Sequence, residues 1–450
     1  MLNRMSQADR HTAVYVGTYP PKECGIASFT MDAVNATDLA GWRSYVIAVD
    51  DCDTSNEYND SKVIMTIGKE RLADYHRAAK LIAEEKFGVV CIEHEYGIYG
   101  GDDGAYVIDF VKAVNAPVVV TLHTVLPEPS DSQRRIVKEL EKHCAAFVVM
   151  AKTAVEILRT AYGVSPSKIH VIPHGAPMVP FHADKSAKAQ FGLQGRRVIS
   201  TFGLISPNKG IEDAIQAMRS VVDAEPTAMY LVLGQTHPVI KRREGEWYRD
   251  QLVKQVSDLG LQDNVRFVDK YLSLQELLNY LLATDVYITP YYANPNQITS
   301  GTLAYAVAAG KVVVSTPYLH AKELLAESRG FLYPFRDVDE LARITGNLLT
   351  DHALFERTRT LAYAYGRAMT WPSVGVRYAR LYKGLLDLTW SGRAAMEPID
   401  MVSLFEREIS ATRRIVAPLV TLGRTELVPL RRIPAPTESA VKRADTALAA

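Results

Sequence analysis

The sequence predicts an α/β protein made of two similar domains, each built on a parallel sheet. Short β-branched runs alternate with segments of helical apolar spacing along most of the chain. The alternation stops in a polar stretch that contains Pro177 and Pro180, and it starts again near residue 198. A chain of 450 residues is long enough to give both domains a full hydrophobic core.

The first half of the chain contains a series of segments that we interpret as strands. They cover residues 13–17, 45–49, 63–67, 89–93, 118–122, 147–150 and 169–173, with helices expected from residue 27 and over 73–85. Helical segments separate most of these strands. This order is typical of a parallel, doubly wound sheet, because a crossover helix must connect neighbouring parallel strands.

The second half repeats the pattern. Strands are expected over 198–203, 229–234, 265–268, 285–290 and 312–315, and helices over 211–224, 247–259, 275–283 and 303–309. The polar stretch that ends near Gly195 therefore reads as a linker between two domains of similar size.

The segment between the last two expected strands predicts an anion site. The polar run Thr299-Ser-Gly-Thr302 opens a short apolar helix, which stops at Gly310, a residue that favours a left-handed helix end. The first amides of a helix have no partner within it, and the helix dipole places partial positive charge there. We expect a phosphate group to bind at this helix start.

Composition excludes several classes of function. Lys and Arg number 51, as do Asp and Glu, so net charge gives no reason to expect nucleic acid or an anionic membrane as a partner. No run approaches the ~18 apolar residues of a membrane span, and residues 1–11 lack the apolar region of a signal peptide, so we expect a cytoplasmic protein.

The cysteine pattern gives no reason to expect a metal. Cys24, Cys52, Cys91 and Cys144 lack metal-type CxxC spacing and fit reduced thiols. Asp51-Cys-Asp53 matches a DxD pattern that binds a metal and a diphosphate in some enzymes, but metal-dependent DxD sites belong to a fold other than the one expected here. We expect neither a metal nor a cofactor.

The chain has an expected strand at 285–290, then the polar run Thr299–Thr302, and then a helix that ends at Gly310-Lys311. This layout resembles the retaining glycosyltransferases of family 4, which have the GT-B fold. That family usually has two glutamates in this segment, and their positions fall on Gln297 and Tyr305. The resemblance implies two Rossmann-like domains facing across a cleft. The implied divisions are an acceptor-side domain over 1–180, a donor-binding domain over 195–370, a helix over 371–390 that crosses back to the first domain, and an extension over 391–450, partly helical and then disordered.

In the N-terminal domain, the resemblance implies the residues around the transferred sugar. The loop with Gly25 and Ile26 would face the sugar, and His123 would point into the cleft beside it. An acceptor-side pocket would lie around His94, Glu95 and Tyr96. The same comparison assigns His174 a structural role.

In the C-terminal domain, the resemblance implies the donor site. Asn208 and Lys209 follow the first strand and would contact the donor diphosphate, whereas Leu204 stands where the family has arginine. Phosphate would also bind at Thr299, Ser300, Gly301 and Thr302. Tyr305 takes the place of the carboxylate that holds the nucleotide ribose. Gln297 can hydrogen-bond sugar hydroxyls but supplies no negative charge.

The leading hypothesis is a metal-independent, retaining hexosyltransferase. It would use a nucleotide-diphosphate sugar of the GDP-mannose or UDP/ADP-glucose type and a carbohydrate or glycoconjugate acceptor. As in the family, the departing phosphate would act as base for front-face attack. Two alternatives remain: a glycoside phosphorylase that uses phosphate or a sugar 1-phosphate, and a catalytically silent scaffold that binds carbohydrate. A homo-oligomer or a partner contact through residues 391–450 is also considered.

Overall fold

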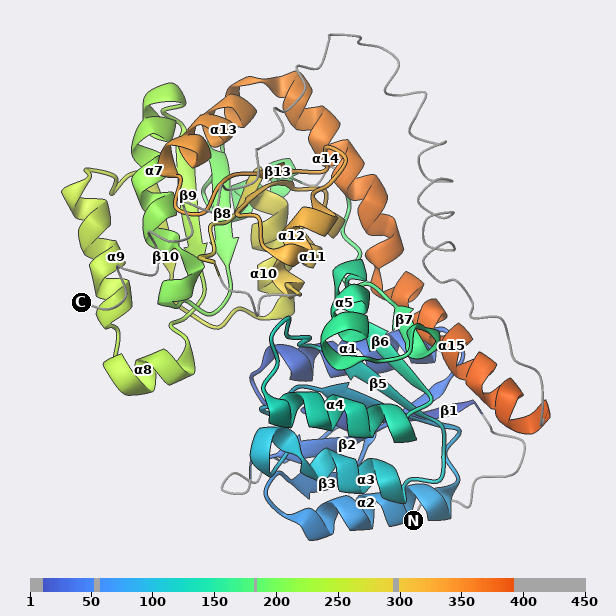
Figure 1. The fold of residues 1–450 in the computed structure, drawn as a ribbon. Coiled ribbons are helices and arrows are strands. Elements are labelled where there is room, and N and C mark those ends of the chain that lie inside the picture. The colour runs from blue at the N-terminus through green and yellow to red at the C-terminus, as the bar shows by residue number, and fades with distance from the viewer. Residues whose placement is uncertain (1–10, 52–56, 182–183, 294–298, 392–450) are drawn as a thin grey trace, which may run out of the picture. The chain divides into compact units, whose positions relative to one another are not determined.

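The computed structural model describes residues 11–51, 57–181, 184–293 and 299–391. These residues form two β-sheets, each made of parallel strands (Figure 1). Each sheet has a hydrophobic core on both of its faces. The expected extension over 391–450 lies outside the described residues apart from Ser391.

The N-terminal lobe is built on a sheet with the strand order β3-β2-β1-β4-β5-β6-β7, in which all neighbours pair in parallel. Its strands are β1 (Thr12–Gly17), β2 (Arg43–Asp50), β3 (Val63–Gly68), β4 (Val89–His94), β5 (Val118–Leu122), β6 (Ala146–Val149) and β7 (Ile169–Val171). Its helices are α1 (Gly25–Leu39), α2 (Leu72–Glu85), α3 (Tyr106–Ala113), α4 (Asp131–His143) and α5 (Lys152–Ile157).

The C-terminal lobe is built on a second parallel sheet, in the order β10-β9-β8-β11-β12-β13. Its strands are β8 (Arg197–Phe202), β9 (Ala228–Leu233), β10 (Val265–Val268), β11 (Val286–Thr289), β12 (Val312–Ser315) and β13 (Phe331–Leu332). The helices after residue 183 are α6 (Asp184–Gln190), α7 (Ile211–Ala224), α8 (Pro238–Glu244), α9 (Trp247–Asp258), α10 (Leu274–Ala283), α11 (Gly301–Ala308), α12 (Leu319–Leu324), α13 (Val338–Thr350), α14 (His352–Gly366) and α15 (Trp371–Ser391).

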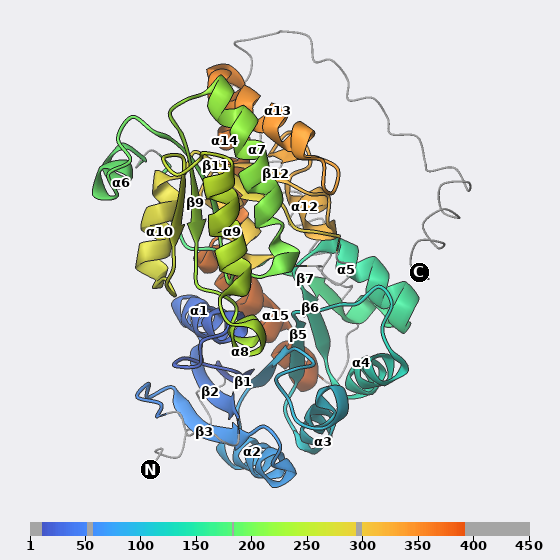
Figure 2. The same ribbon diagram turned by 90° about the vertical axis from the view of Figure 1, so that its left-hand side faces the viewer.

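The strands are apolar throughout because both of their faces are buried. In β1, Ala13 and Tyr15 pack into the core cluster on one side of the sheet, and Val14 and Val16 pack into the cluster on the other side. Figure 2 shows α7 and α9 over the C-terminal sheet, where residues of both helices share one core cluster with β8 and β9. The predicted class of two doubly wound α/β domains is confirmed.

Each sheet has a point where its strand order changes direction. β1 lies between β2 and β4 in the first sheet, and β8 lies between β9 and β11 in the second. The loops after such neighbouring strands run to opposite faces of the sheet and leave a crevice at the carboxyl ends, where α/β proteins bind ligands. The described residues of both lobes belong to one compact unit.

The helix α15 packs against the N-terminal lobe, although it follows the C-terminal lobe in sequence. The Tyr382 hydroxyl donates a hydrogen bond to the Tyr15 hydroxyl of β1 (3.0 Å), and the hydroxyls of Tyr378 and Thr121 are 3.1 Å apart. The resemblance implied a returning helix in this part of the chain. Among the described helices, none is both long enough and apolar enough to span a lipid bilayer.

Candidate active site

A cavity of about 670 Å³ opens at the carboxyl ends of strands from both lobes. One wall comes from the loop after β1 and from α1, and the other from the loops after β8, β9 and β10 and from the start of α11. These are the positions where the strand order of each sheet changes, so the fold places a ligand site there. The volume lies within the range of ~300–1,000 Å³ typical of small-molecule sites.

Two helices point their N-termini into this cavity, one from each lobe. α1 starts with Gly25 and Ile26, α11 starts with Gly301 and Thr302, and all four residues line the cavity. None of their backbone amides has a hydrogen-bond acceptor among the described residues. Free amides and two positive helix ends that face one cavity favour a ligand with negative charge.

The cap of α11 occupies one amide that the sequence analysis assigned to phosphate. Ser300 Oγ accepts a hydrogen bond from the Leu303 amide (3.3 Å), and the Ser300 amide donates to Nδ1 of His320 (2.9 Å). The Ser300 amide therefore has a protein partner, and among the described residues the amides that remain free at this helix start are those of Gly301 and Thr302. Thr299, the residue before this cap, lines the cavity.

Gly301 lies directly against His174 of the N-terminal lobe. A Cβ atom on Gly301 would lie 2.9 Å from Nε2 of His174, so any other residue would force the two apart. Burial lowers the pKa of His174 to about 4, and its Nδ1 lies 2.7 Å from the carbonyl oxygen of Gly175. His174 was expected to be purely structural, but it lines the cavity as a neutral ring.

Lys209 lies close to the start of α11 without lining the cavity itself. Its ammonium group is 4.0 Å from the ring centre of Tyr291, whose hydroxyl is 3.2 Å from the Thr302 hydroxyl. No carboxylate among the described residues forms an ion pair with Lys209. The neighbouring Asn208 is exposed and accepts a hydrogen bond from the Ser206 hydroxyl (2.5 Å), so it shapes the loop that holds Lys209.

His123 lines the cavity at the end of β5 and is held by a buried carboxylate. Its Nε2 lies 2.8 Å from Oε2 of Glu93, which is completely buried. Phe29 packs edge-on against the imidazole ring, with the ring centres 4.7 Å apart. The sequence predicted His123 at this position, but the Glu93 partner was not predicted.

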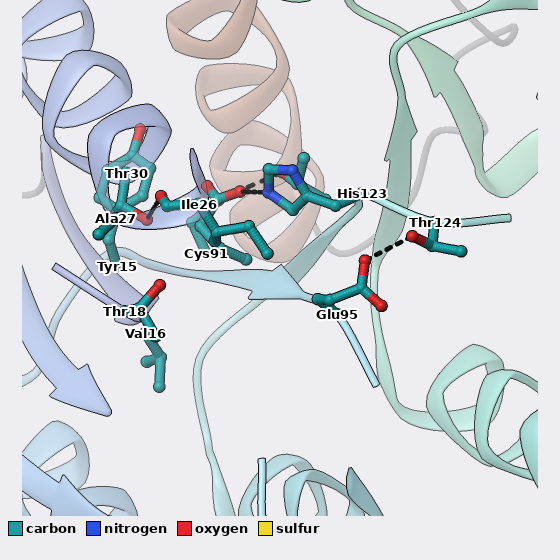
Figure 3. Close-up of polar contacts among 12 residues, drawn as sticks. Tyr15, Val16, Thr18, Ile26, Ala27, Thr30, Cys91, Glu95, His123 and Thr124 are labelled. Carbon is teal, nitrogen blue, oxygen red and sulfur yellow. Dashed lines mark hydrogen bonds and ion pairs between the residues drawn. The ribbon is translucent and has the colours of Figure 1, made fainter. Parts of the chain in front are cut away.

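The residues expected on the acceptor side lie outside the cavity wall. His94 is fully buried, and burial lowers its pKa to about 3, so it is a neutral core residue packed edge-on against Tyr96. Glu95 accepts hydrogen bonds from the Thr124 hydroxyl and from the Tyr96 amide (Figure 3). This corrects the expectation that the His94 ring faces a ligand; of this segment, the side chain of Ile98 lines the cavity.

Tyr305 lines the cavity on α11, one turn after Gly301, and contacts the opposite lobe. Its hydroxyl lies 3.5 Å from Oδ2 of Asp32, which lines the cavity from α1. Burial raises the pKa of Asp32 to about 6, against the opposing effect of the nearby Tyr305 hydroxyl and Trp371 indole. Asp32 was not predicted as a site residue, although its spacing of seven from Gly25 places it on the same face of α1.

The apolar end of the cavity was also missed by the sequence analysis. It is lined by the loop after β10 and the first turn of α10, including Tyr271, Leu272, Leu274 and Leu277. The helix start here carries a clear signal, because Ser273 and Glu276 form a reciprocal capping box. That signal marks a helix start but carries no information about a ligand.

Two predicted features lie outside the described residues. Gln297 belongs to the segment 294–298, and Cys52 and Asp53 of the DxD pattern belong to 52–56. Over the residues that are described, no group of three or more His, Cys, Asp or Glu side chains is arranged to hold a metal ion.

Two doubly wound α/β lobes with a shared cavity at their strand ends define the GT-B class of fold, and solved structures of this class match the chain. HepE from Anabaena, solved in complex with UDP, has a TM-score of 0.68 at 16% identity, covering 83% of this chain and 100% of its own. Sucrose-phosphate synthase from Thermosynechococcus elongatus has a TM-score of 0.66 at 18% identity, covering 84% and 99%. At these identities, the likeness establishes the fold.

The sequence matches family models in both lobes. The model for Glycosyltransferase Family 4 matches residues 25–178, and the model for Glycosyl transferases group 1 matches residues 196–351. The chain is therefore a glycosyltransferase of the family 4 type, as the resemblance in its motifs implied.

Curated relatives agree with this family. A GDP-mannose-dependent monoacylated alpha-(1-6)-phosphatidylinositol monomannoside mannosyltransferase from Corynebacterium glutamicum is 24% identical over 76% of this chain and 90% of its own. A D-inositol 3-phosphate glycosyltransferase from Segniliparus rotundus is 30% identical over 34% of this chain and 36% of its own length.

Proposed function

We propose that this protein is a cytoplasmic, metal-independent, retaining hexosyltransferase that uses a nucleotide-diphosphate sugar. The observation that carries the proposal is the pair of helix N-termini, α1 and α11, that open into one cavity from opposite lobes. Such a cavity suits a ligand with negative charge at its centre. A nucleotide-diphosphate sugar is such a ligand, because its two phosphates lie between the nucleoside and the sugar.

The donor diphosphate would bind at the start of α11. The free amides of Gly301 and Thr302 would donate to its oxygens, and Lys209 would add positive charge. Lys209 has no carboxylate partner in the described structure, so no ion pair has to break when phosphate binds. The apolar end near Leu274 and Leu277 would take the nucleobase.

The transferred sugar would lie at the other end, between Gly25 and His123. A Cβ atom on Gly25 would meet no atom within 4 Å, so there is room for a ligand at the backbone of α1. The buried carboxylate of Glu93 orients the ring of His123 and keeps a proton on Nε2. Gln297, which lies outside the described residues, stays a sequence-based candidate for hydrogen bonding to sugar hydroxyls.

The names of similar proteins suggest which substrates to propose. The corynebacterial relative is named for GDP-mannose, and HepE was solved with UDP-glucose. Both relatives described above carry inositol in the name of their acceptor. We therefore place GDP-mannose and UDP-glucose first among donors, and inositol-containing glycoconjugates first among acceptors.

The test is thermal unfolding with UDP, GDP, ADP, their hexose conjugates and sugar 1-phosphates. A ligand at 100 times its Kd stabilises the native state by about 2.7 kcal/mol, which is a clear shift in Tm. Stabilisation by a nucleoside diphosphate supports the transferase. A response to sugar phosphates alone favours the phosphorylase, and no response to any of them contradicts both enzymes.

A variant locates the ligand. Lys209→Ala should weaken nucleoside diphosphate binding by about 10- to 150-fold, the equivalent of ~1.5–3 kcal/mol for one charge-assisted hydrogen bond. Lys254→Ala is the matched control, because Lys254 is an exposed residue of α9 that pairs with Asp258. Equal Kd values for Lys209→Ala and the wild type would remove Lys209 from the site.

A further inference from the structure

The wall of the cavity carries a carboxylate that the proposed reaction has not used. Asp32 and Glu23 are the acidic residues among the described residues that line the cavity. Glu23 is exposed, whereas Asp32 is partly buried between the two lobes. A partly buried carboxylate without a cation beside it is costly, so its presence in a ligand cavity requires a reason.

The hydrogen bonds of Asp32 leave room for a ligand. Its carboxylate accepts from the Tyr305 hydroxyl at 3.5 Å, a long contact. A carboxylate offers about four acceptor positions. No Lys, Arg or His side chain within the described ranges forms an ion pair with Asp32, so its remaining positions are open to hydroxyl donors.

The position of Asp32 specifies which part of a nucleotide it would meet. Its partner Tyr305 lies one turn after Gly301, whose amide faces the proposed phosphate site. Tyr305 also lines the same cavity as Tyr271 of its apolar end, and the nearby Tyr271 adds to the effect of burial in raising the pKa of Tyr305. The Asp32–Tyr305 pair thus lies between the phosphate end and the base end.

We propose that Asp32 binds the ribose hydroxyls of the donor nucleotide from the N-terminal lobe. In a nucleoside diphosphate, ribose connects the base to the phosphates, and its vicinal hydroxyls are the neutral donors that a carboxylate prefers. The negative charge of Asp32 repels phosphate, which orients the nucleotide with its phosphates toward Gly301. This inference rests on the proposed function.

The arrangement has a structural consequence. Phosphate contacts come from α11 in the C-terminal lobe, whereas the ribose contact comes from α1 in the N-terminal lobe. One bound nucleotide therefore links both lobes. The N-terminal lobe would therefore distinguish ribose from dideoxyribose, while the C-terminal lobe binds the phosphates.

The experiment compares the affinity of GDP and UDP with that of their 2′,3′-dideoxy counterparts by calorimetry. The wild type should bind the ribonucleotide about 10- to 100-fold more tightly than the dideoxynucleotide. In Asp32→Asn this ratio should fall to less than about threefold, while the affinity for the dideoxynucleotide is unchanged. Glu23→Gln is the matched control and should retain the full preference. The melting curve of unliganded Asp32→Asn checks that the variant is folded.

The possible results separate the role of Asp32 from the proposed function. A preference that persists in folded Asp32→Asn, or a wild type that binds both forms equally, would overturn the role of Asp32 and leave the proposed function standing. A wild type that binds neither GDP nor UDP would overturn both.

Discussion

Nε2 of His123 lies 2.8 Å from Oε2 of Glu93, a carboxylate that is completely buried at the end of β4. An ionised carboxylate keeps the proton of a neutral imidazole on the nitrogen that faces it, which leaves Nδ1 as the acceptor nitrogen. Among the described residues, Nδ1 of His123 has no hydrogen-bond partner. The pair therefore leaves His123 able to accept a hydrogen bond from a ligand in the cavity, and we propose a sugar hydroxyl as the donor.

We predict that His123→Ala lowers kcat/KM by about 10- to 100-fold, since it removes one hydrogen bond from a preorganised site. Glu93→Gln keeps the shape of the side chain but donates through its amide, which favours the other tautomer. We expect it to lower kcat/KM nearly as much. The measurement is initial-rate kinetics with the nucleotide sugar that stabilises the protein. His76→Ala, on the exposed face of α2, is the control; an equal loss there would contradict the assignment.

Most strands could be predicted from the sequence because both sheet faces are buried. The expected strands at 118–122, 265–268 and 312–315 have the bounds of β5, β10 and β12. β13, with two residues, was not predicted because it is too short for a pattern. α8 was not predicted either, because its Lys241–Arg243 charges hide any apolar period.

The candidate site was predictable where local sequence creates it. The free amides at Gly301 and Thr302 follow from a polar loop before an apolar helix. Contacts between residues far apart in the sequence carry no local signal. The hydrogen bond from the Ser300 amide to His320 and the contact of Asp32 with Tyr305 both depend on packing. His94 shows the opposite error, since a polar residue beside glycines reads as functional while the fold buries it.

A second prediction concerns a contact between the lobes at α5. This helix starts without a side-chain cap of its own, and Glu323 of α12 supplies one from the C-terminal lobe. Its carboxylate accepts hydrogen bonds from the amides of Lys152 (2.9 Å) and Thr153 (3.2 Å). Glu323→Ala should lower the free energy of unfolding by about 1–2 kcal/mol.

Urea unfolding followed by circular dichroism measures this loss. Glu340→Ala is the control, because Glu340 forms a surface pair with Arg343 and should cost less than about 1 kcal/mol. If both variants lose the same amount, Glu323 acts as an ordinary surface residue and its cap contributes nothing to stability.

A third prediction compares two helical glycines. A Cβ atom on Gly375 of α15 would lie 2.1 Å from the carbonyl oxygen of Ala36 in α1, so the two helices pack closely because the residue is glycine. Gly375→Ala should cost about 1–3 kcal/mol or more, because it pushes α15 off the lobe. Gly346→Ala in α13 meets only the Cβ of Ala224 at 3.7 Å. It should be neutral or stabilise the protein by up to about 1 kcal/mol.

Thermal unfolding of both variants provides the comparison. Opposite shifts in Tm are expected although the chemical change is the same. A shift of equal sign and size in the two proteins would show that helix propensity, rather than the approach of α15 to α1, governs the effect.

A fourth prediction follows from the raised pKa of Asp32. Burial raises this pKa to about 6 in the folded protein, whereas an aspartate in an unfolded chain titrates near ~4. Between these pH values the folded state holds a proton that the unfolded state has lost. The free energy of unfolding therefore decreases as the pH rises from about 4 to about 6, and the full loss applies at higher pH.

Asp32→Asn removes the charge and keeps the shape of the side chain, so it should remove this loss of stability at high pH. Without ligand, the variant should be more stable than the wild type by about 1–3 kcal/mol at pH 8, and the two should agree at pH 4. Urea unfolding at both pH values measures the difference. Asp258→Asn, at an exposed pair with Lys254, should show no such gain. A gain at pH 4 as large as that at pH 8 would mean that packing, and not the buried charge, separates Asn from Asp at this position.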